Sequence, residues 1–269
     1  YVAVGSSPSA LVFSHDGVLW QRAEGLPDDV PWSAVCHGAD RFVALSGTAE
    51  SPARTAAFSM DGRRWQTAEL PRTAAWTAVR HGPEGFAALP AAGAQGARSS
   101  DGISWESFAV QDGEGFCALE YSGGLLLALP SGSADGLFAS QNGQSWEKLP
   151  LPQTARWRSL CSDGEITLLA GGSAFARARA PLSAPQSVAG AVQRAMPGRY
   201  GTGWRQMSAP GGAAWTFADY CEDRYVALAA AESRAAWSYD GENWNLLRLP
   251  SAGGWQRICY GGGKYVVYG

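Results

Sequence analysis

The segment SYDGENW (238–244) decides the fold, because four near copies of it recur along the chain: SHDGVLW (14–20), SMDGRRW (59–65), SSDGISW (99–105) and SQNGQSW (140–146). All share a box with Ser first, Asp or Asn third, Gly fourth and Trp last. A sixth copy, GRYGTGW (198–204), keeps only the Gly and the Trp. The box tryptophans are spaced 45, 40, 41, 58 and 40 residues apart, at Trp20, Trp65, Trp105, Trp146, Trp204 and Trp244.

A second aromatic residue follows each box Trp after 11 or 12 positions: Trp32, Trp76, Phe116, Trp157, Trp215 and Trp255. It opens an apolar run, and a Gly-containing turn then leads to another run such as FVAL (42–45). Each repeat therefore reads as four short strands, a to d, with the box forming the turn from c into d. Asp-Gly is a strong hairpin signal, since Gly accepts a positive φ and Asp caps turn N–H groups.

Four antiparallel strands per 40 to 45 residues, repeated along the chain, predict an all-β fold, the β-propeller. The chain has six a strands and six c–d hairpins, but seven b-like runs if YVAVG (1–5) and KYVVYG (264–269) are both counted. We predict six blades closed by a composite blade from both chain ends, with seven blades as the alternative. Residues 1–269 are predicted to form a single domain.

The boxes resemble the Asp-box, or BNR, repeats of sialidase-like propellers. They differ in having Asp and Gly adjacent, and in this they are similar to a non-catalytic bacterial and phage repeat type. We expect the box carboxylates and amide to cap their turns, and the box tryptophans to stabilise packing between blades. The expected structural residues are Asp16, Asp61, Asp101, Asn142 and Asp240, with Trp20, Trp65, Trp105, Trp146, Trp204 and Trp244.

Composition excludes several functions. The formal charge of −3, from 24 acidic and 21 basic residues, gives no electrostatic case for nucleic-acid binding. No apolar run is long enough for a membrane helix, and the five Cys form no C-x-x-C pair. All 12 Trp occupy repeat positions, which favours a structural role over a stacking surface. We predict no metal and no cofactor, since box carboxylates spaced one per blade lie too far apart to share an ion.

We also predict that the chain is not an enzyme. The resemblance implies that sialidase chemistry would need an arginine triad, an acid/base carboxylate, a Tyr nucleophile with its Glu, and the family's Arg-Ile-Pro motif, which this sequence lacks. No G-x-S-x-G motif or His cluster is present either. A glycoside hydrolase remains an alternative, with Asp28, Asp29, Asp112 and Glu114 as its candidate acids.

Function in a repeat protein is expected where the repeat is broken. The fifth repeat is about 18 residues too long, and we predict an insertion at 172–198 in its b–c connection. A smaller excess lies at 46–55 in the second repeat. Both point to the face formed by the b–c and d–a loops, where we predict a protein or glycan partner. The candidate partner-binding residues are Arg177, Arg179, Arg194, Arg199, Glu50 and Arg54.

These observations favour a non-enzymatic interaction or assembly module. We expect it in an extracellular, cell-surface or virion protein, such as part of a phage tail or of a larger assembly. The alternative within the same fold is a lectin-like propeller that binds glycans.

Overall fold

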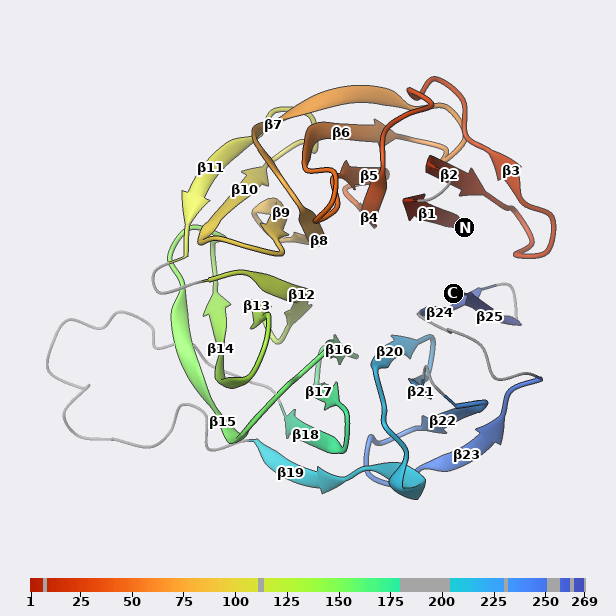
Figure 1. Cartoon of the computed structure of the whole chain (residues 1–269), viewed down its shortest axis with the longest axis vertical. Coiled ribbons are helices and arrows are strands. Elements are labelled where there is room, and N and C mark those ends of the chain that lie inside the picture. The colour runs from red at the N-terminus through yellow and green to blue at the C-terminus, as the bar shows by residue number, and fades with distance from the viewer. Residues whose placement is uncertain are drawn as a thin grey trace, which may run out of the picture. The chain divides into compact units, whose positions relative to one another are not determined.

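Each complete repeat folds into one four-stranded antiparallel sheet whose strand order follows the sequence (Figure 1). The computed structural model describes residues 1–6, 9–110, 114–179, 204–229, 232–250, 257–261 and 264–268. The first two complete sheets are β4 (Trp32–Gly38), β5 (Arg41–Ser46), β6 (Ala53–Ser59) and β7 (Gln66–Ala74), and β8 (Trp76–Gly82), β9 (Gly85–Pro90), β10 (Gln95–Ser99) and β11 (Glu106–Ala109).

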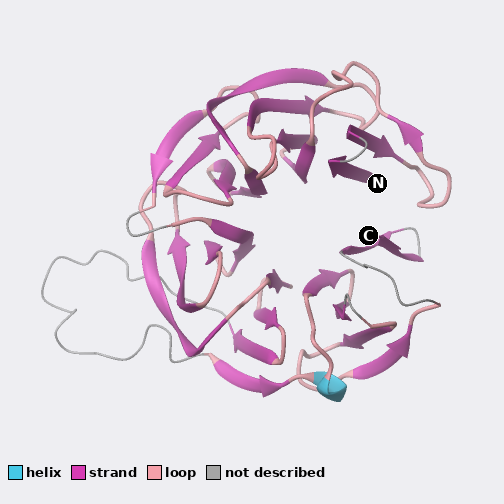
Figure 2. Ribbon diagram, in the orientation of Figure 1, coloured by secondary structure: helices cyan, strands magenta, loops and turns pink. Residues whose placement is uncertain are grey.

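Three further complete sheets follow. They are β12 (Phe116–Ser122), β13 (Leu125–Pro130), β14 (Ala134–Ser140) and β15 (Glu147–Ala155); β16 (Ser159–Ser162), β17 (Ile166–Gly171), β18 (Ala174–Arg179) and β19 (Arg205–Ser208); and β20 (Phe217–Cys221), β21 (Arg224–Ala229), β22 (Arg234–Ser238) and β23 (Asn245–Arg248). Among the described residues the only helix is the short 3-10 turn η1 (Pro210–Gly212), so their regular secondary structure is almost entirely β-strand (Figure 2).

The chain ends form two smaller sheets. One is three-stranded, with β1 (Val2–Ser6), β2 (Ser9–Phe13) and β3 (Gln21–Arg22), and the other pairs β24 (Arg257–Gly261) with β25 (Lys264–Tyr268). The predicted all-β propeller of six four-stranded antiparallel blades is confirmed, with five complete sheets and the remaining strands at the two ends. Both b-like runs form strands, each paired within its own sheet.

The chain divides into two compact units, and each is described by itself. The first unit holds Tyr1–Leu119 and the box segment Asn142–Trp146, and the second holds Glu120–Gln141 and Glu147–Gly269. In the first unit β4 packs beside both β1 and β8; in the second, β20 packs beside both β16 and β24. The a strands of consecutive repeats thus lie next to one another within a unit. The predicted single domain and the predicted composite blade would each require the two units to be placed relative to one another. These two statements therefore stay predictions.

The predicted position of the insertion needs a correction. Residues 174–179 form strand β18, the third strand of its sheet, so the b–c connection is only Gly172 and Ser173. The extra length lies instead between β18 and β19, where other repeats carry the box. From Ala176 to Arg179 the alanines are buried and the arginines are more exposed, which is a strand pattern of period two. Ala is depleted in strands, so the segment gives only a weak strand signal in the sequence.

The five boxes that the structure describes are hydrogen-bonded turns of similar geometry. In the box at 59–65, the buried Ser59 Oγ donates to Asp61 Oδ1 at 3.0 Å and accepts the Gly62 N–H at 2.9 Å. Asp61 Oδ1 accepts the N–H groups of Arg63 and Arg64, both at 2.8 Å. The Trp65 indole N–H then donates to the Gly62 carbonyl at 2.8 Å. In the box at 140–146, the amide oxygen of Asn142 accepts the two corresponding N–H groups.

The box turn also packs against the preceding repeat of its unit. A Cβ added to Gly102 would lie 2.7 Å from Val43 on β5, and one added to Gly241 would lie 2.8 Å from Leu168 on β17. Two arginines of the preceding repeats form hydrogen bonds with the same turns. Arg41 donates to the Asp101 carbonyl at 2.8 Å, and Arg177 donates to the Asp240 carbonyl at 3.0 Å. The box therefore joins neighbouring blades as well as two strands of its own.

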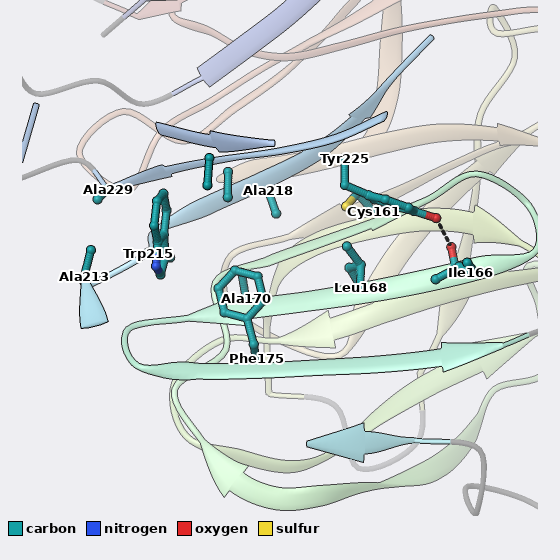
Figure 3. Packing of buried hydrophobic residues seen from close by; sticks show 12 residues of the cluster. Cys161, Ile166, Leu168, Ala170, Phe175, Ala213, Trp215, Ala218, Tyr225 and Ala229 are labelled. Carbon is teal, nitrogen blue, oxygen red and sulfur yellow. Dashed lines mark hydrogen bonds between the residues drawn. The ribbon is translucent and has the colours of Figure 1, made fainter. Parts of the chain in front are cut away.

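The core between the fifth and sixth repeats lies within the second unit (Figure 3). Trp215 and Phe175 are completely buried there, and the Tyr225 hydroxyl donates to the Ile166 carbonyl at 3.0 Å. Trp215 is held at three points. Its indole N–H donates to the Pro210 carbonyl at 2.9 Å, and its backbone exchanges two hydrogen bonds with Gly172.

Replacing Trp215 with Ala should lower the free energy of unfolding by about 3–5 kcal/mol, because a large aromatic side chain leaves a cavity in a packed core. Urea denaturation followed by circular dichroism measures the change. Leu19→Ala is the matched control, since Leu19 is 71% exposed and should change stability by less than about 0.5 kcal/mol. Equal effects of the two variants would contradict the assigned core.

The box carboxylates should make stability depend on pH. The Leu19 and Val18 N–H groups lower the pKa of Asp16 to about 2, against about 3.9 in an unfolded chain. Ionised Asp16 therefore favours the fold above about pH 4, and this contribution is lost as pH falls toward 2. Asp16→Asn should be less stable than the parent at pH 7, and the urea midpoints should converge near pH 2.

The exposed hairpin residue Asp40 provides the control for the loss of one negative charge, because it lies outside the boxes. At pH 7 the urea midpoint of Asp40→Asn should lie close to that of the parent, whereas that of Asp16→Asn should be lower. A constant difference between Asp16→Asn and the parent from pH 7 to pH 2 would contradict the assigned role of the carboxylate charge.

Candidate binding site

One group of side chains in the second unit departs from the repeat, and we call it the Arg224 cluster: Arg224, Trp237, Tyr239 and Tyr265. The Arg224 guanidinium carbon lies 5.2 Å from the Trp237 ring centroid, 5.0 Å from that of Tyr239 and 6.0 Å from that of Tyr265. These distances are within the range of cation–π attraction. Three aromatic rings from two sheets therefore surround one cation.

The local sequence explains why these residues meet. Glu222 and Asp223 form a tight turn between β20 and β21, in which Glu222 has a φ of +60°, and Arg224 follows as the first residue of β21. Trp237 lies on the neighbouring strand β22, opposite Val226. Tyr239 is the variable second residue of the box, and Tyr265 lies on β25. The cluster thus joins an a–b hairpin to a c–d turn.

The cluster is rigid on one side and open on the other. Trp237 is partly buried and packs against the hydrophobic core that contains Phe217 and Leu228. Tyr239 meets Trp237 edge-on, with ring centroids 5.1 Å apart, yet remains 58% exposed. Tyr265 is 38% exposed. The tyrosine rings are therefore positioned by protein contacts while much of their surface faces solvent.

Carboxylates lie beside the cluster, in its own a–b hairpin and in the neighbouring one. Asp223 pairs with Arg224 through two hydrogen bonds of 2.7 and 3.1 Å, which raises the pKa of the guanidinium further and neutralises its charge. The pKa of the Tyr265 phenol is raised by burial, with Asp223 and Glu222 among the smaller causes. Burial also raises the pKa of Tyr220, and Asp163 and Asp223 add to it. These phenols therefore keep their protons at neutral pH.

The arginines of the long repeat that were predicted to bind a partner differ in burial and in their contacts. Arg177 is well buried, with a side chain 13% exposed, and pairs with Glu242 at 2.8 Å. Together with its bond to the Asp240 carbonyl, this pairing makes it a link between two blades. Arg179 is exposed at the end of β18. Arg194 and Arg199 lie outside the described residues.

The other two predicted residues lie in the first unit. Glu50 is exposed in the turn between β5 and β6. Arg54, on β6, pairs with Glu69 of β7 at 2.8 Å across the solvent-facing side of the sheet. Exposed ion pairs of this kind contribute little to stability. No contact joins Glu50 to Arg54 among the interactions described for that unit.

Sequence reasoning did not identify the Arg224 cluster as a site. The repeat pattern predicts a structural role for Trp237, Tyr239 stands at the variable position of its box, and Arg224 occupies the same register as Arg41. The usable signal was the segment Trp-Ser-Tyr at 237–239, where Trp and Tyr flank the box Ser. It could have been combined with Arg224, which begins the adjacent strand.

No group of three or more His, Cys, Asp or Glu residues in the described part of the chain is arranged to hold a metal ion. No helix among the described residues is long and apolar enough to cross a membrane.

Comparison with known proteins shows the fold. No family model and no curated protein matches the chain. A selenomethionine structure of virginiamycin B lyase from Staphylococcus aureus matches with a TM-score of 0.72 at 9% identity, covering 99% of this chain and 89% of the lyase. A catalytically inactive His-to-Ala variant of that lyase with quinupristin gives 0.75 at 8% identity, covering 99% and 90%. YCF48 bound to a D1 peptide gives 0.68 at 15% identity, covering 96% and 82%.

These matches change two predictions. They confirm the propeller, but they are lyases and YCF48 rather than proteins clearly of the sialidase-like Asp-box group. The prediction that the chain is not an enzyme is contradicted, because lyases share this fold over 97–99% of the chain. The missing sialidase residues argued against one chemistry only, and the fold carries others.

Proposed function

We propose that this chain is a propeller that binds a peptide segment of a protein partner at the Arg224 cluster. The observation that carries the proposal is Tyr239, which is 58% exposed although its ring contacts both Trp237 and Arg224. Tyr, Trp and Arg are the residues most enriched at binding hot spots. A ring already held in place loses little conformational entropy when a partner covers it.

Further support comes from the strand connections. The a–b and c–d connections emerge at the same end of an antiparallel sheet, so the Arg224 cluster lies at the end where the chain leaves β18 at Arg179. We therefore propose this end of the second unit as the binding face, in place of the b–c and d–a face expected from sequence. YCF48, a propeller of similar fold, was solved with a bound peptide.

We also propose that the boxes are Asp-box repeats. The Ser–Asp–Gly–Trp geometry of the boxes supports an Asp-box repeat, since Ser and Asp side chains cap the turn in each box that keeps both. We propose a surface or assembly protein as the setting. Glycan binding, the earlier alternative, is less well supported than peptide binding, because the cluster pairs its rings with a guanidinium and carboxylates.

Tyr239→Ala should weaken peptide binding about 10- to 100-fold, the range expected for a hot-spot residue. Ligands would be selected from a random peptide library displayed on phage, and the affinities of the selected peptides measured by fluorescence anisotropy. Met60→Ala is the matched control, because Met60 occupies the same box position and is 63% exposed. Failure to enrich any peptide, or equal losses in both variants, would contradict the proposal.

A lyase activity is the second candidate function, favoured by a histidine pair in the first unit. His81 packs directly over Gly38, where an added Cβ would lie 2.2 Å from the imidazole Cγ. Burial, with a smaller contribution from His37, lowers the pKa of His81. A neutral imidazole at physiological pH can act as a general base. Among the structural neighbours, one lyase is inactive as a His-to-Ala variant.

Incubation with quinupristin, followed by liquid chromatography, tests this second candidate. If the chain is such a lyase, quinupristin should be consumed by the parent, and His81→Ala should slow its loss at least 100-fold, as expected for removal of a general base. Conversion that is unchanged in His81→Ala, or no conversion by the parent, would contradict it.

A further inference from the structure

Resting on the proposed peptide-binding function, we infer that the partner segment is basic and places an arginine side chain against Tyr239. Three observations in the second unit lead to this inference: the group that already stacks in the cluster, the charge that remains around it, and the open surface of Tyr239.

The cluster shows which chemical group its rings accept. Arg224 places its guanidinium within 6.0 Å of three ring centroids, and the two nearest rings, Trp237 and Tyr239, lie at 5.2 and 5.0 Å. A guanidinium is planar and weakly hydrated, so it stacks on aromatic faces more readily than an ammonium group. A second guanidinium on the exposed part of Tyr239 would extend the same stack.

The charge around the cluster favours a cation. Asp223 already neutralises Arg224 through its two hydrogen bonds. Glu222 is exposed in the same hairpin. The neighbouring a–b hairpin carries Asp163 and Glu165, and its strand β16 packs beside β20. Neither acid is in a described ion pair with a basic side chain. An incoming arginine would therefore meet several carboxylates beside the cluster, and such charge complementarity also steers association.

The hydrogen bonds of Asp163 shape its hairpin, while the acids at the two hairpin tips stay exposed to a ligand. Asp163 Oδ1 accepts the N–H groups of Glu165 and Ile166, at 2.7 and 2.6 Å, which fixes the hairpin. Glu165 and Glu222 lie at the exposed tips of the two hairpins. A basic segment that crosses both tips could pair with two carboxylates and stack on Tyr239, so more than one cationic residue is expected in it.

The test begins with the peptides selected from the random library. We expect them to be enriched in arginine. In the best binder, Arg→Gln should weaken binding at least 10-fold and Arg→Lys should weaken it less. Binding should also fall between 50 and 200 mM NaCl, because salt screens exposed charges. Selected peptides that lack basic residues but lose binding in Tyr239→Ala would overturn this inference and leave the proposed function standing. No selected peptide at all would overturn both.

A charge variant of the protein provides the independent measurement. Glu222→Gln should weaken the arginine peptide several-fold and reduce the salt dependence of its binding. Glu84→Gln is the matched control, because Glu84 is exposed in the equivalent hairpin between β8 and β9. Thermal melting shows whether both variants keep the parent's fold. Equal losses in the two variants, or unchanged binding in Glu222→Gln, would overturn the inference.

Discussion

The interaction on which the rest of the structure depends is the capped turn of the box. A buried Ser hydroxyl and an Asp carboxylate together satisfy the N–H groups of a turn in which Gly has a positive φ, as at Gly62. Because this Gly has no side chain, the turn can approach the preceding blade, as Gly241 does at Leu168. One local motif therefore determines both the hairpin from c to d and the packing of neighbouring sheets. Trp146 shows the packing within the first unit, since its ring stacks on Phe108 of β11 with the centroids 5.8 Å apart.

Much of the fold follows from the sequence because the same local requirements recur at a fixed spacing. Each box needs Ser, a side-chain acceptor and Gly in order. In the described repeats a large aromatic side chain at or just before the start of the a strand becomes buried, as Trp32, Trp76 and Trp215 do. The prediction was weakest in the repeat that lost these markers. Without a box Ser and Asp to locate the end of strand c, the segment 174–179 was assigned to an insertion, although Arg177 and Ala176 follow the alternation of a strand.

The candidate site was harder to predict because it depends on neighbours in space. Arg41 and Arg224 both begin a b strand, yet Arg41 donates to a box carbonyl of the next blade while Arg224 is paired with Asp223 and surrounded by rings. The difference comes from Trp237, Tyr239 and Tyr265, which lie 13, 15 and 41 residues further along the chain. Arg177 illustrates the opposite error. Its basic surroundings in the sequence suggested a partner site, but Glu242 and the Asp240 carbonyl, more than 60 residues away, bind it within the protein.

A propeller fold does not by itself determine what a protein does. Virginiamycin B lyases and YCF48, which was solved with a bound peptide, match this chain at 8–15% identity, so the shared sheets do not by themselves determine an activity. Function must then reside where side chains depart from the repeat while remaining anchored to it. The Arg224 cluster meets both conditions, since Trp237 reaches into the core and Tyr239 remains open to solvent. A repeat fold can therefore change its chemistry by altering a few exposed turn residues, because the box turns and buried tryptophans preserve the surrounding framework.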